Sequence, residues 1–276
     1  MSMSIANWLK RKRTFIVSTS KSKKANIGIA LSGGGAKGFA HIGVLKALNE
    51  HGIDPDVLSG TSMGSLVGVL YAAGKTPNKI QELVKSAPVL KMVKLAWGKS
   101  GMFQMSPIRK ILENEVGEDN FNSLHKPFYL SVSNINEGKA EVFHQGELFD
   151  RVIASCSVPV LFMPQIINKI TYVDGGLYDN LPTRSIRKLC KTLIGVHINY
   201  TGTMSSFKGM KEVAERTFML AIDQNVKASM KNCDIVIDPP EMQKFTFWDF
   251  DKVDEIVEVG YTFTKEMIEK GEIPSP

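Results

Sequence analysis

The sequence predicts an α/β fold, namely a three-layer α/β/α sandwich around a mostly parallel central sheet. Short apolar segments alternate along the chain with segments that have the apolar spacing of helices. Glycines follow the first two apolar segments, at the points where a strand is expected to turn into a helix. The 276 residues, 43% of them hydrophobic, are enough to bury one sizeable core. Strands that alternate with helices are typical of a parallel sheet covered on both faces.

The first half of the chain contains the clearest elements. Residues 26–32 are apolar, short and followed by glycines, which predicts a buried strand. Residues 38–52 have apolar side chains at helical spacing and end at a glycine, and residues 56–60 are expected to be a second short strand. An apolar helix is expected at 63–74, where a glycine again ends the pattern, and a further helix at 77–90.

The second half is expected to add strands at one edge of the sheet. Two adjacent strands, at 126–135 and 140–144, are joined through a turn at Gly138. A hairpin is expected at 165–176, turning around Asn168 and Lys169. The remaining expected elements are a helix at 146–157, a strand at 192–200, a helix at about 211–230, a strand at 234–238 and a helix at about 253–270.

Residues 91–107 fit neither the helical nor the strand period. They contain three methionines, a tryptophan and a phenylalanine. We interpret them as a loop that packs on the core, and an apolar flap over a lipid-sized site is the alternative.

The net charge of +6 is concentrated at the N-terminus. Residues 1–24 hold seven basic side chains and no acidic one, so the rest of the chain has a net charge of about −1. We expect residues 1–24 to be a flexible arm and residues 25–276 to be a single domain. Peripheral contact of this arm with an anionic membrane is the alternative to a solvated segment. Nucleic-acid binding by the folded part is not expected, because the positive charge belongs to the arm.

Neither a signal peptide nor a membrane-spanning segment is expected. The longest apolar run of the basic segment is Phe15–Val17, whereas a signal peptide needs about 7–15 apolar residues. A spanning helix needs about 18 apolar residues in a row, and no segment provides them. Cys156, Cys190 and Cys233 share no metal-binding spacing and are interpreted as reduced thiols. The sequence therefore indicates a cytoplasmic protein and leaves its oligomeric state open.

A glycine-rich loop follows the first expected strand. Gly33, Gly35 and Gly38 match G-x-G-x-x-G between a strand and a helix, the context of a dinucleotide-binding fingerprint. Asp56, 18 residues after Gly38, is near where a ribose-binding acid is expected, but it precedes the second strand instead of ending it. Glycines also let successive N–H groups point into one space, where they can hold a phosphate or an oxyanion.

A second glycine-flanked turn follows the second strand. Gly60-Thr61-Ser62-Met63-Gly64 matches G-x-S-x-G between a strand and a helix, as a nucleophile elbow requires. The serine of such an elbow lies on a strained turn that brings the residues two before and two after it together. Only small residues fit there, and both are glycine.

Two residues are candidates for the base that a serine nucleophile needs. His197 is the best of five histidines, since the order Ser62, Asp174, His197 suits an α/β-hydrolase triad. Its place in an alternating apolar strand favours a structural role instead. Asp174 ends an expected strand and precedes Gly175 and Gly176, which let the backbone turn sharply and expose the carboxylate. The residues by themselves leave both alternatives open.

Four stretches, taken together, resemble the patatin-like phospholipases, a family that includes bacterial lysophospholipase-like proteins and the catalytic domain of neuropathy target esterase. They are GGGAKGFAHIGVL at 33–45, GTSMGS at 60–65, ASCSVPVLFMP at 154–164 and DGGLYDNLP at 174–182. The resemblance covers about residues 26–240 and does not include the basic segment.

The resemblance implies a serine hydrolase of lipid acyl esters that uses a serine–aspartate dyad without a histidine. Ser62 would be the nucleophile and Asp174 the base. The supporting residues that it implies are Gly60 and Gly64 of the elbow, Gly175 and Gly176 of the turn, and an oxyanion hole formed by Gly33, Gly34, Gly35 and Ala36. It implies no metal and no organic cofactor, and its partner is a lipid or acyl-ester substrate of unspecified head group and chain length.

Overall fold

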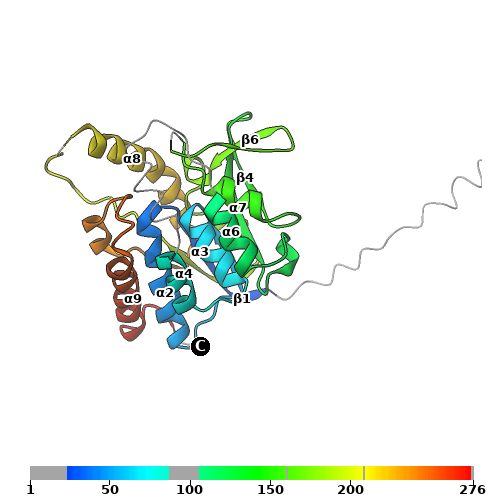
Figure 1. The fold of residues 1–276 in the computed structure, drawn as a ribbon. Coiled ribbons are helices and arrows are strands. Elements are labelled where there is room, and N and C mark those ends of the chain that lie inside the picture. The colour runs from blue at the N-terminus through cyan, green and yellow to red at the C-terminus, as the bar shows by residue number, and fades with distance from the viewer. Residues whose placement is uncertain (1–23, 87–105, 160, 208, 275–276) are drawn as a thin grey trace, which may run out of the picture.

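The structure is a computed structural model, and it describes residues 24–86, 106–159, 161–207 and 209–274 (Figure 1). Two of the predictions concern residues that lie mostly outside these ranges. The basic arm at 1–24, apart from Lys24, lies outside the described residues, and so does the segment 91–107 apart from its last two residues.

A sheet of eight strands forms the centre of the described part of the chain, in the order β5-β6-β3-β2-β1-β7-β8, with β4 paired to β3. The strands are β1 (Ala25–Leu31), β2 (Val57–Gly60), β3 (Phe128–Asn134), β4 (Lys139–Phe143), β5 (Gln165–Ile167), β6 (Ile170–Asp174), β7 (Cys190–Val196) and β8 (Ile235–Ile237). Five of them, β1, β2, β3, β7 and β8, pair in parallel, and β4, β5 and β6 pair antiparallel. The prediction of a mostly parallel sheet is confirmed.

Seven α-helices are described. They are α2 (Ala40–Glu50), α3 (Met63–Ala72), α4 (Pro77–Ser86), α6 (Ser106–Glu115), α7 (Phe149–Ser155), α8 (Met210–Met230) and α9 (Val253–Glu269). Helices α2, α4 and α9 lie side by side in Figure 1, and α2 packs against both α4 and α9. Helix α6 was not expected from the sequence, and no described helix is both long and apolar enough to cross a bilayer.

The strand β1 shows that both faces of the sheet are covered. Ile29 and Leu31 belong to the large core that includes the apolar residues of α2, α3 and α9. Ala30, which lies between them, belongs to a second core with Leu181 and Leu193. Alternate side chains of a strand point to opposite faces, so β1 contacts apolar layers on both sides. This explains why residues 27–31 have no polar side chain and do not alternate.

The register of β3 brings two other strands end to end. Leu130 pairs with Gly60, the last residue of β2, and Val132 pairs with Asp174, the last residue of β6. Strand β4 pairs with both of these β3 residues as well, so it occupies the other edge of β3. Strands β2 and β6 therefore share one edge of β3, run in opposite directions and end two residues apart. The turns that follow them meet at this point.

Candidate active site

The predicted elbow is present between β2 and α3. Ser62 has φ 54° and ψ −126°, a left-handed conformation that a serine adopts only under constraint. A Cβ on Gly60 would lie 2.5 Å from the carbonyl oxygen of Gly64, and a Cβ on Gly64 would collide with the carbonyl oxygens of Leu31 and Ser32. Gly60 is thus restricted by its approach to Gly64, and Gly64 by its approach to the end of β1.

Hydrogen bonds at both backbone groups hold Ser62 in this conformation. Its N–H donates to Ser155 Oγ at 3.0 Å, and Ser155 Oγ donates in turn to the carbonyl oxygen of Ser131 at 2.8 Å. Its carbonyl oxygen accepts from Ser65 Oγ at 2.6 Å and from Cys156 Sγ at 3.2 Å. Two of these partners, Ser155 and Cys156, follow one another at the end of α7.

Asp174 lies at the end of β6 and is held by the same segment. Its N–H donates to the carbonyl oxygen of Ser157 at 2.9 Å, and its Oδ1 accepts from the N–H of Gly176 at 2.8 Å. The turn is tight, because a Cβ on Gly175 would collide with the carbonyl oxygen of Ser131. Residues 155–157 thus bind the backbone of both Ser62 and Asp174.

Ser62 and Asp174 form a buried pair, each side chain belonging to a residue that is 5% exposed. Burial raises the pKa of the Asp174 carboxyl to about 6, while the nearby Ser62 hydroxyl and the Gly176 N–H lower it. Asp174 Oδ2 is buried and has no hydrogen-bond partner among the described residues. The serine hydroxyl therefore lies near a carboxylate oxygen that can still accept a proton.

The glycine loop lies against Ser62. A Cβ on Gly33 would be 3.0 Å from Ser62 Cβ. Of the four predicted oxyanion donors, the N–H of Gly33 donates to the carbonyl oxygen of Asn180 at 3.1 Å, and that of Ala36 donates to Phe247 at 3.0 Å. The N–H groups of Gly34 and Gly35 have no acceptor among the described residues. Gly34 is the N-cap and Gly35 the first residue of the short helix η1 (Gly35–Phe39), whose N-terminal end adds a favourable dipole for an anion.

The candidate histidine base, His197, pairs with another carboxylate. His197 Nδ1 lies 3.0 Å from Asp238 Oδ1, so its carboxylate partner is Asp238 and not Asp174. His41 is fully buried, its Nε2 lies 2.7 Å from the carbonyl oxygen of Ser32, and burial lowers its pKa to about 4. Both rings have structural partners, which agrees with the interpretation of His197 as a structural residue.

The acid of the dinucleotide fingerprint lies at the wrong end of the sheet. Asp56 Oδ2 accepts from the N–H groups of Asn26 and Ile27 at 2.8 and 2.9 Å. These are residues at the start of β1, whereas the glycine loop follows its end. A ribose held at the glycine loop would therefore not reach Asp56.

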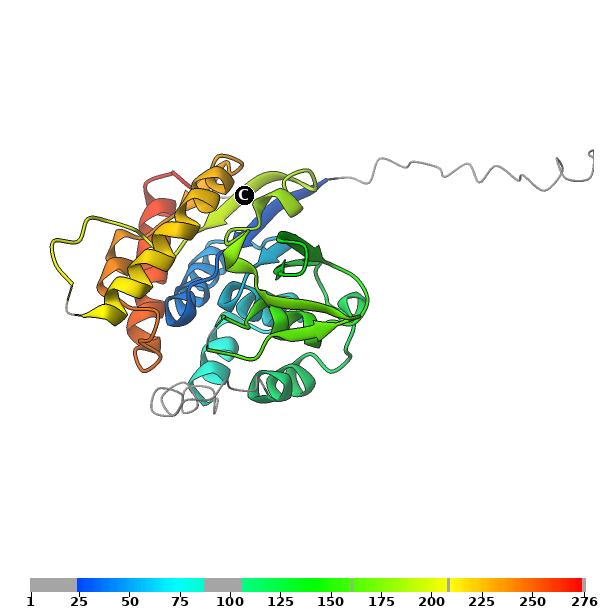
Figure 2. The same ribbon diagram turned by 90° about the horizontal axis from the view of Figure 1, so that it is seen from above.

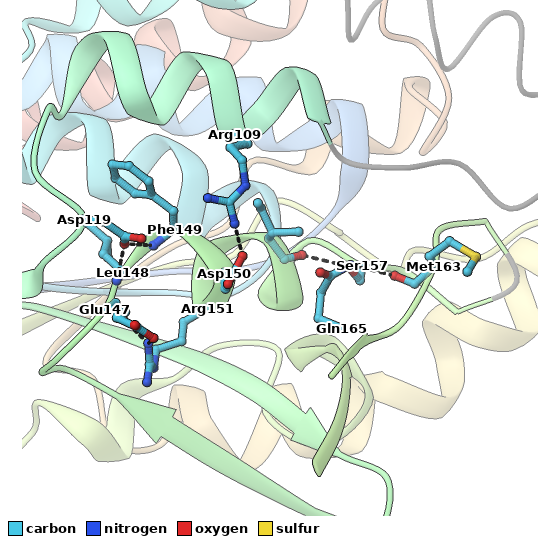
Figure 3. Close-up of polar contacts among 11 residues, drawn as sticks. Arg109, Asp119, Glu147, Leu148, Phe149, Asp150, Arg151, Ser157, Met163 and Gln165 are labelled. Carbon is cyan, nitrogen blue, oxygen red and sulfur yellow. Dashed lines mark hydrogen bonds and ion pairs between the residues drawn. The ribbon is translucent and has the colours of Figure 1, made fainter. Parts of the chain in front are cut away.

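Helix α7, which leads to Ser155, is fixed at its N-terminal end (Figure 3). Asp119 Oδ1 accepts from the N–H groups of Leu148 and Phe149 at 2.7 and 2.6 Å. Asp150, in the first turn of α7, forms an ion pair with Arg109 of α6.

The sequence analysis did not predict the individual roles of Ser155 and Cys156, because the stretch 154–164 indicated only a segment beside the site. Asn180, whose carbonyl oxygen binds the Gly33 N–H, was also missed.

Comparison with known proteins gives a consistent result. A family model described as "Patatin-like phospholipase" matches residues 29–186, more than half of the chain. Lysophospholipase NTE1 of Eremothecium gossypii is 27% identical over 90% of this chain and 19% of its own length. Patatin-like phospholipase domain-containing protein 6 of Homo sapiens is 29% identical over 87% of this chain and 20% of its own length. The chain thus spans about a fifth of the length of these relatives.

Among solved structures, the heterodimeric ExoU–SpcU complex from the type III secretion system of Pseudomonas aeruginosa contains a similar chain. The TM-score is 0.48 and the sequence identity 16%, over 89% of this chain and 51% of that one.

Proposed function

The chain belongs to the patatin-like phospholipase family, and we propose that it hydrolyses acyl ester bonds of lipids with Ser62 as nucleophile and Asp174 as general base. The observation that carries this proposal is the buried pair itself. A strained serine lies beside a carboxylate whose pKa of about 6 lies close to neutral pH. A base of this pKa is largely ionised at pH 7 and still has appreciable proton affinity.

In the acylation step, Ser62 Oγ attacks the ester carbonyl carbon while its proton moves to Asp174. The carbonyl π electrons move onto the carbonyl oxygen, which becomes an oxyanion. The tetrahedral intermediate then collapses, the bond to the alcohol oxygen breaks, and Asp174 returns the proton to that oxygen. A water molecule then attacks the acyl ester of Ser62 while Asp174 takes its proton. The fatty acid leaves, and the proton returns to Ser62 Oγ.

We assign the oxyanion hole to the N–H groups of Gly34 and Gly35. Both donors lie at the N-terminal end of η1 and have no acceptor among the described residues, whereas the N–H groups of Gly33 and Ala36 already donate to carbonyl oxygens. A donor that needs no rearrangement stabilises the developing charge most effectively, and losing one costs about 10²–10³ in rate. The sequence predicted four oxyanion-hole residues, 33–36, and our proposal keeps the two in the middle.

The test is covalent labelling with a fluorophosphonate, followed by mass spectrometry and by hydrolysis of a p-nitrophenyl acyl ester. We expect a single labelled serine, Ser62, in the wild-type protein. We expect Ser62→Ala to lose labelling and Asp174→Asn to lose hydrolysis by at least about 10³-fold.

Asp179→Asn is the matched control for the base. Asp179 lies five residues after Asp174, and burial likewise raises the pKa of its carboxyl to about 6. It has no role in the proposed mechanism, so we expect most of the activity to remain. Equal losses in the two aspartate variants would contradict the assignment of Asp174, and labelling at a serine other than Ser62 would contradict the proposed nucleophile.

A further inference from the structure

A cavity of about 340 Å³ lies beside the glycine loop, a volume at the lower end of the range of small-molecule sites. Its lining comes from Lys37 of η1, from the loop 199–204, from α8 and from residues 243–246. The start of α8 and the loop before it lie at the edge of the molecule in both views (Figures 1 and 2).

The cavity shares a wall with the proposed oxyanion hole. Asn199, one of the lining residues, donates from Nδ2 to the carbonyl oxygen of Gly33 at 2.5 Å. A Cβ on Gly34 would lie 2.5 Å from Asn199 Oδ1, so the asparagine is in close contact with the loop. Lys37, also in the lining, is only two residues after Gly35. The cavity therefore lies next to the glycine loop that carries the proposed oxyanion donors.

The charged residues of the lining are mostly cations. Lys37, Arg216 and Lys244 line the cavity, with Glu212 as the one acid in the lining. Arg216 donates from Nη2 to the carbonyl oxygen of Gly202 at 2.7 Å, which fixes the guanidinium at the wall and leaves other N–H donors of its planar fork for a ligand. Lys244 is exposed, and no ion pair of it is found within the described part of the chain.

A buried polar atom in the lining also lacks a partner. Asn199 is 3% exposed, and its Oδ1 has no hydrogen bond among the described residues. This atom has almost no accessible surface, and a Cβ on Gly34 would lie 2.5 Å from it, so it packs against the glycine loop and is not open to a ligand in the cavity. The cavity thus presents an excess of cations beside the glycine loop.

We propose that this cavity binds the phosphate-bearing head group of a glycerophospholipid whose acyl ester lies at Ser62, with Arg216 and Lys244 as specificity-determining residues. This inference rests on the proposed function. The phosphate and the ester are attached to the same glycerol, so one substrate spans the two neighbouring sites. The guanidinium binds phosphate oxygens through paired N–H donors, and Lys244 contributes a point charge. Met219 and Phe245, also in the lining, contact the glycerol carbons.

The experiment compares two substrates with the same acyl chain, a lysophospholipid and a monoacylglycerol, both below their critical micelle concentrations. We expect Lys244→Gln and Arg216→Gln each to lower kcat/KM for the lysophospholipid by about 10-fold, because each removes a charge-assisted hydrogen bond. Hydrolysis of the monoacylglycerol should stay at the wild-type rate, since it has no phosphate. Lys231→Gln is the matched control, because it removes the same charge from the exposed residue that follows α8 and does not line the cavity.

Two further measurements separate the alternatives. Ser62→Ala protein, which cannot turn substrate over, is titrated with the lysophospholipid in a calorimeter, and we expect Lys244→Gln in that background to weaken binding by about 10-fold. Inorganic phosphate is added as a competitor against both substrates, and we expect it to inhibit lysophospholipid hydrolysis more strongly.

The inference is overturned if the cavity variants lower kcat/KM equally for both substrates, which would indicate an acyl-chain site. It is likewise overturned if they lower kcat/KM for neither substrate. It is also overturned if inorganic phosphate inhibits both substrates alike, which would indicate a site for free phosphate. Labelling of Ser62 in every variant keeps these outcomes separate from failure of the proposed function, in which the wild-type serine would not react at all.

Discussion

The hydrogen bond from the Ser62 N–H to Ser155 Oγ gives the sharpest prediction about the site. Ser155 is fully buried, and its hydroxyl connects Ser62 to the carbonyl oxygen of Ser131. The change Ser155→Ala leaves the Ser62 N–H without an acceptor. The unpaired N–H costs about 1–3 kcal/mol, and the lost hydrogen bond to Ser131 costs about 1 kcal/mol more, so we expect the free energy of unfolding to fall by about 2–4 kcal/mol.

The effect on reactivity follows from the backbone of Ser62. Its φ of 54° costs about 1–3 kcal/mol, and the surrounding hydrogen bonds have to offset that strain. Without Ser155 Oγ the turn can relax and move the hydroxyl away from Asp174. A displacement of about 1 Å at a reacting atom can lower a rate by about 10²-fold, so we expect fluorophosphonate labelling to slow by about 10- to 100-fold.

Ser157→Ala is the matched control for this change. Ser157 is equally buried, and its Oγ donates to the carbonyl oxygen of Ile153 at 2.8 Å. That carbonyl also accepts from the N–H of Cys156 at 3.1 Å, so its loss leaves no unpaired acceptor. We expect about 1 kcal/mol of destabilisation and an unchanged labelling rate.

Urea unfolding and the labelling time course measure the two quantities separately. If Ser155→Ala labels at the wild-type rate while its stability falls, the hydroxyl supports the fold but does not position the nucleophile, and the reasoning is refuted.

Three other predictions concern the base, the histidine and the elbow. Burial raises the pKa of Asp174 to about 6, and the base has to be ionised, so kcat/KM should rise with pH through about 6 and then level off; a midpoint near 4 would contradict this. The same shift acts on stability in the opposite direction, since ionising a buried carboxyl between about pH 4 and 6 disfavours the folded state. His197→Gln should keep most of the esterase activity, because the ring is paired with Asp238; complete loss would support a triad. Gly64→Ala should lower the free energy of unfolding by about 1–3 kcal/mol, since its Cβ meets backbone, whereas Gly209→Ala, with nothing within 4 Å, should be neutral in thermal unfolding.

The periodicity of the sequence was sufficient for most elements of the fold. The hairpin around Asn168 and Lys169 is confirmed, and both residues have the positive φ, 50° and 68°, that a two-residue hairpin turn requires. Helix α6 was missed because it follows residues 91–105, where the pattern indicates neither helix nor strand, and because it buries only Ile108 and Leu112. Such a short apolar pattern is too weak to predict a helix without its neighbours.

The sequence by itself determined the chemical parts of the candidate site. A serine between two glycines and an aspartate before two glycines are local signals, because strained turns admit few residue types. Only the tertiary structure decided that these turns meet, since β2 and β6 reach the same edge of β3 from opposite directions at Leu130 and Val132. It also decided that Ser155 holds the Ser62 backbone. That contact joins residues 93 positions apart, and such a pairing depends on how the sheet and α7 pack and leaves no local pattern in the chain.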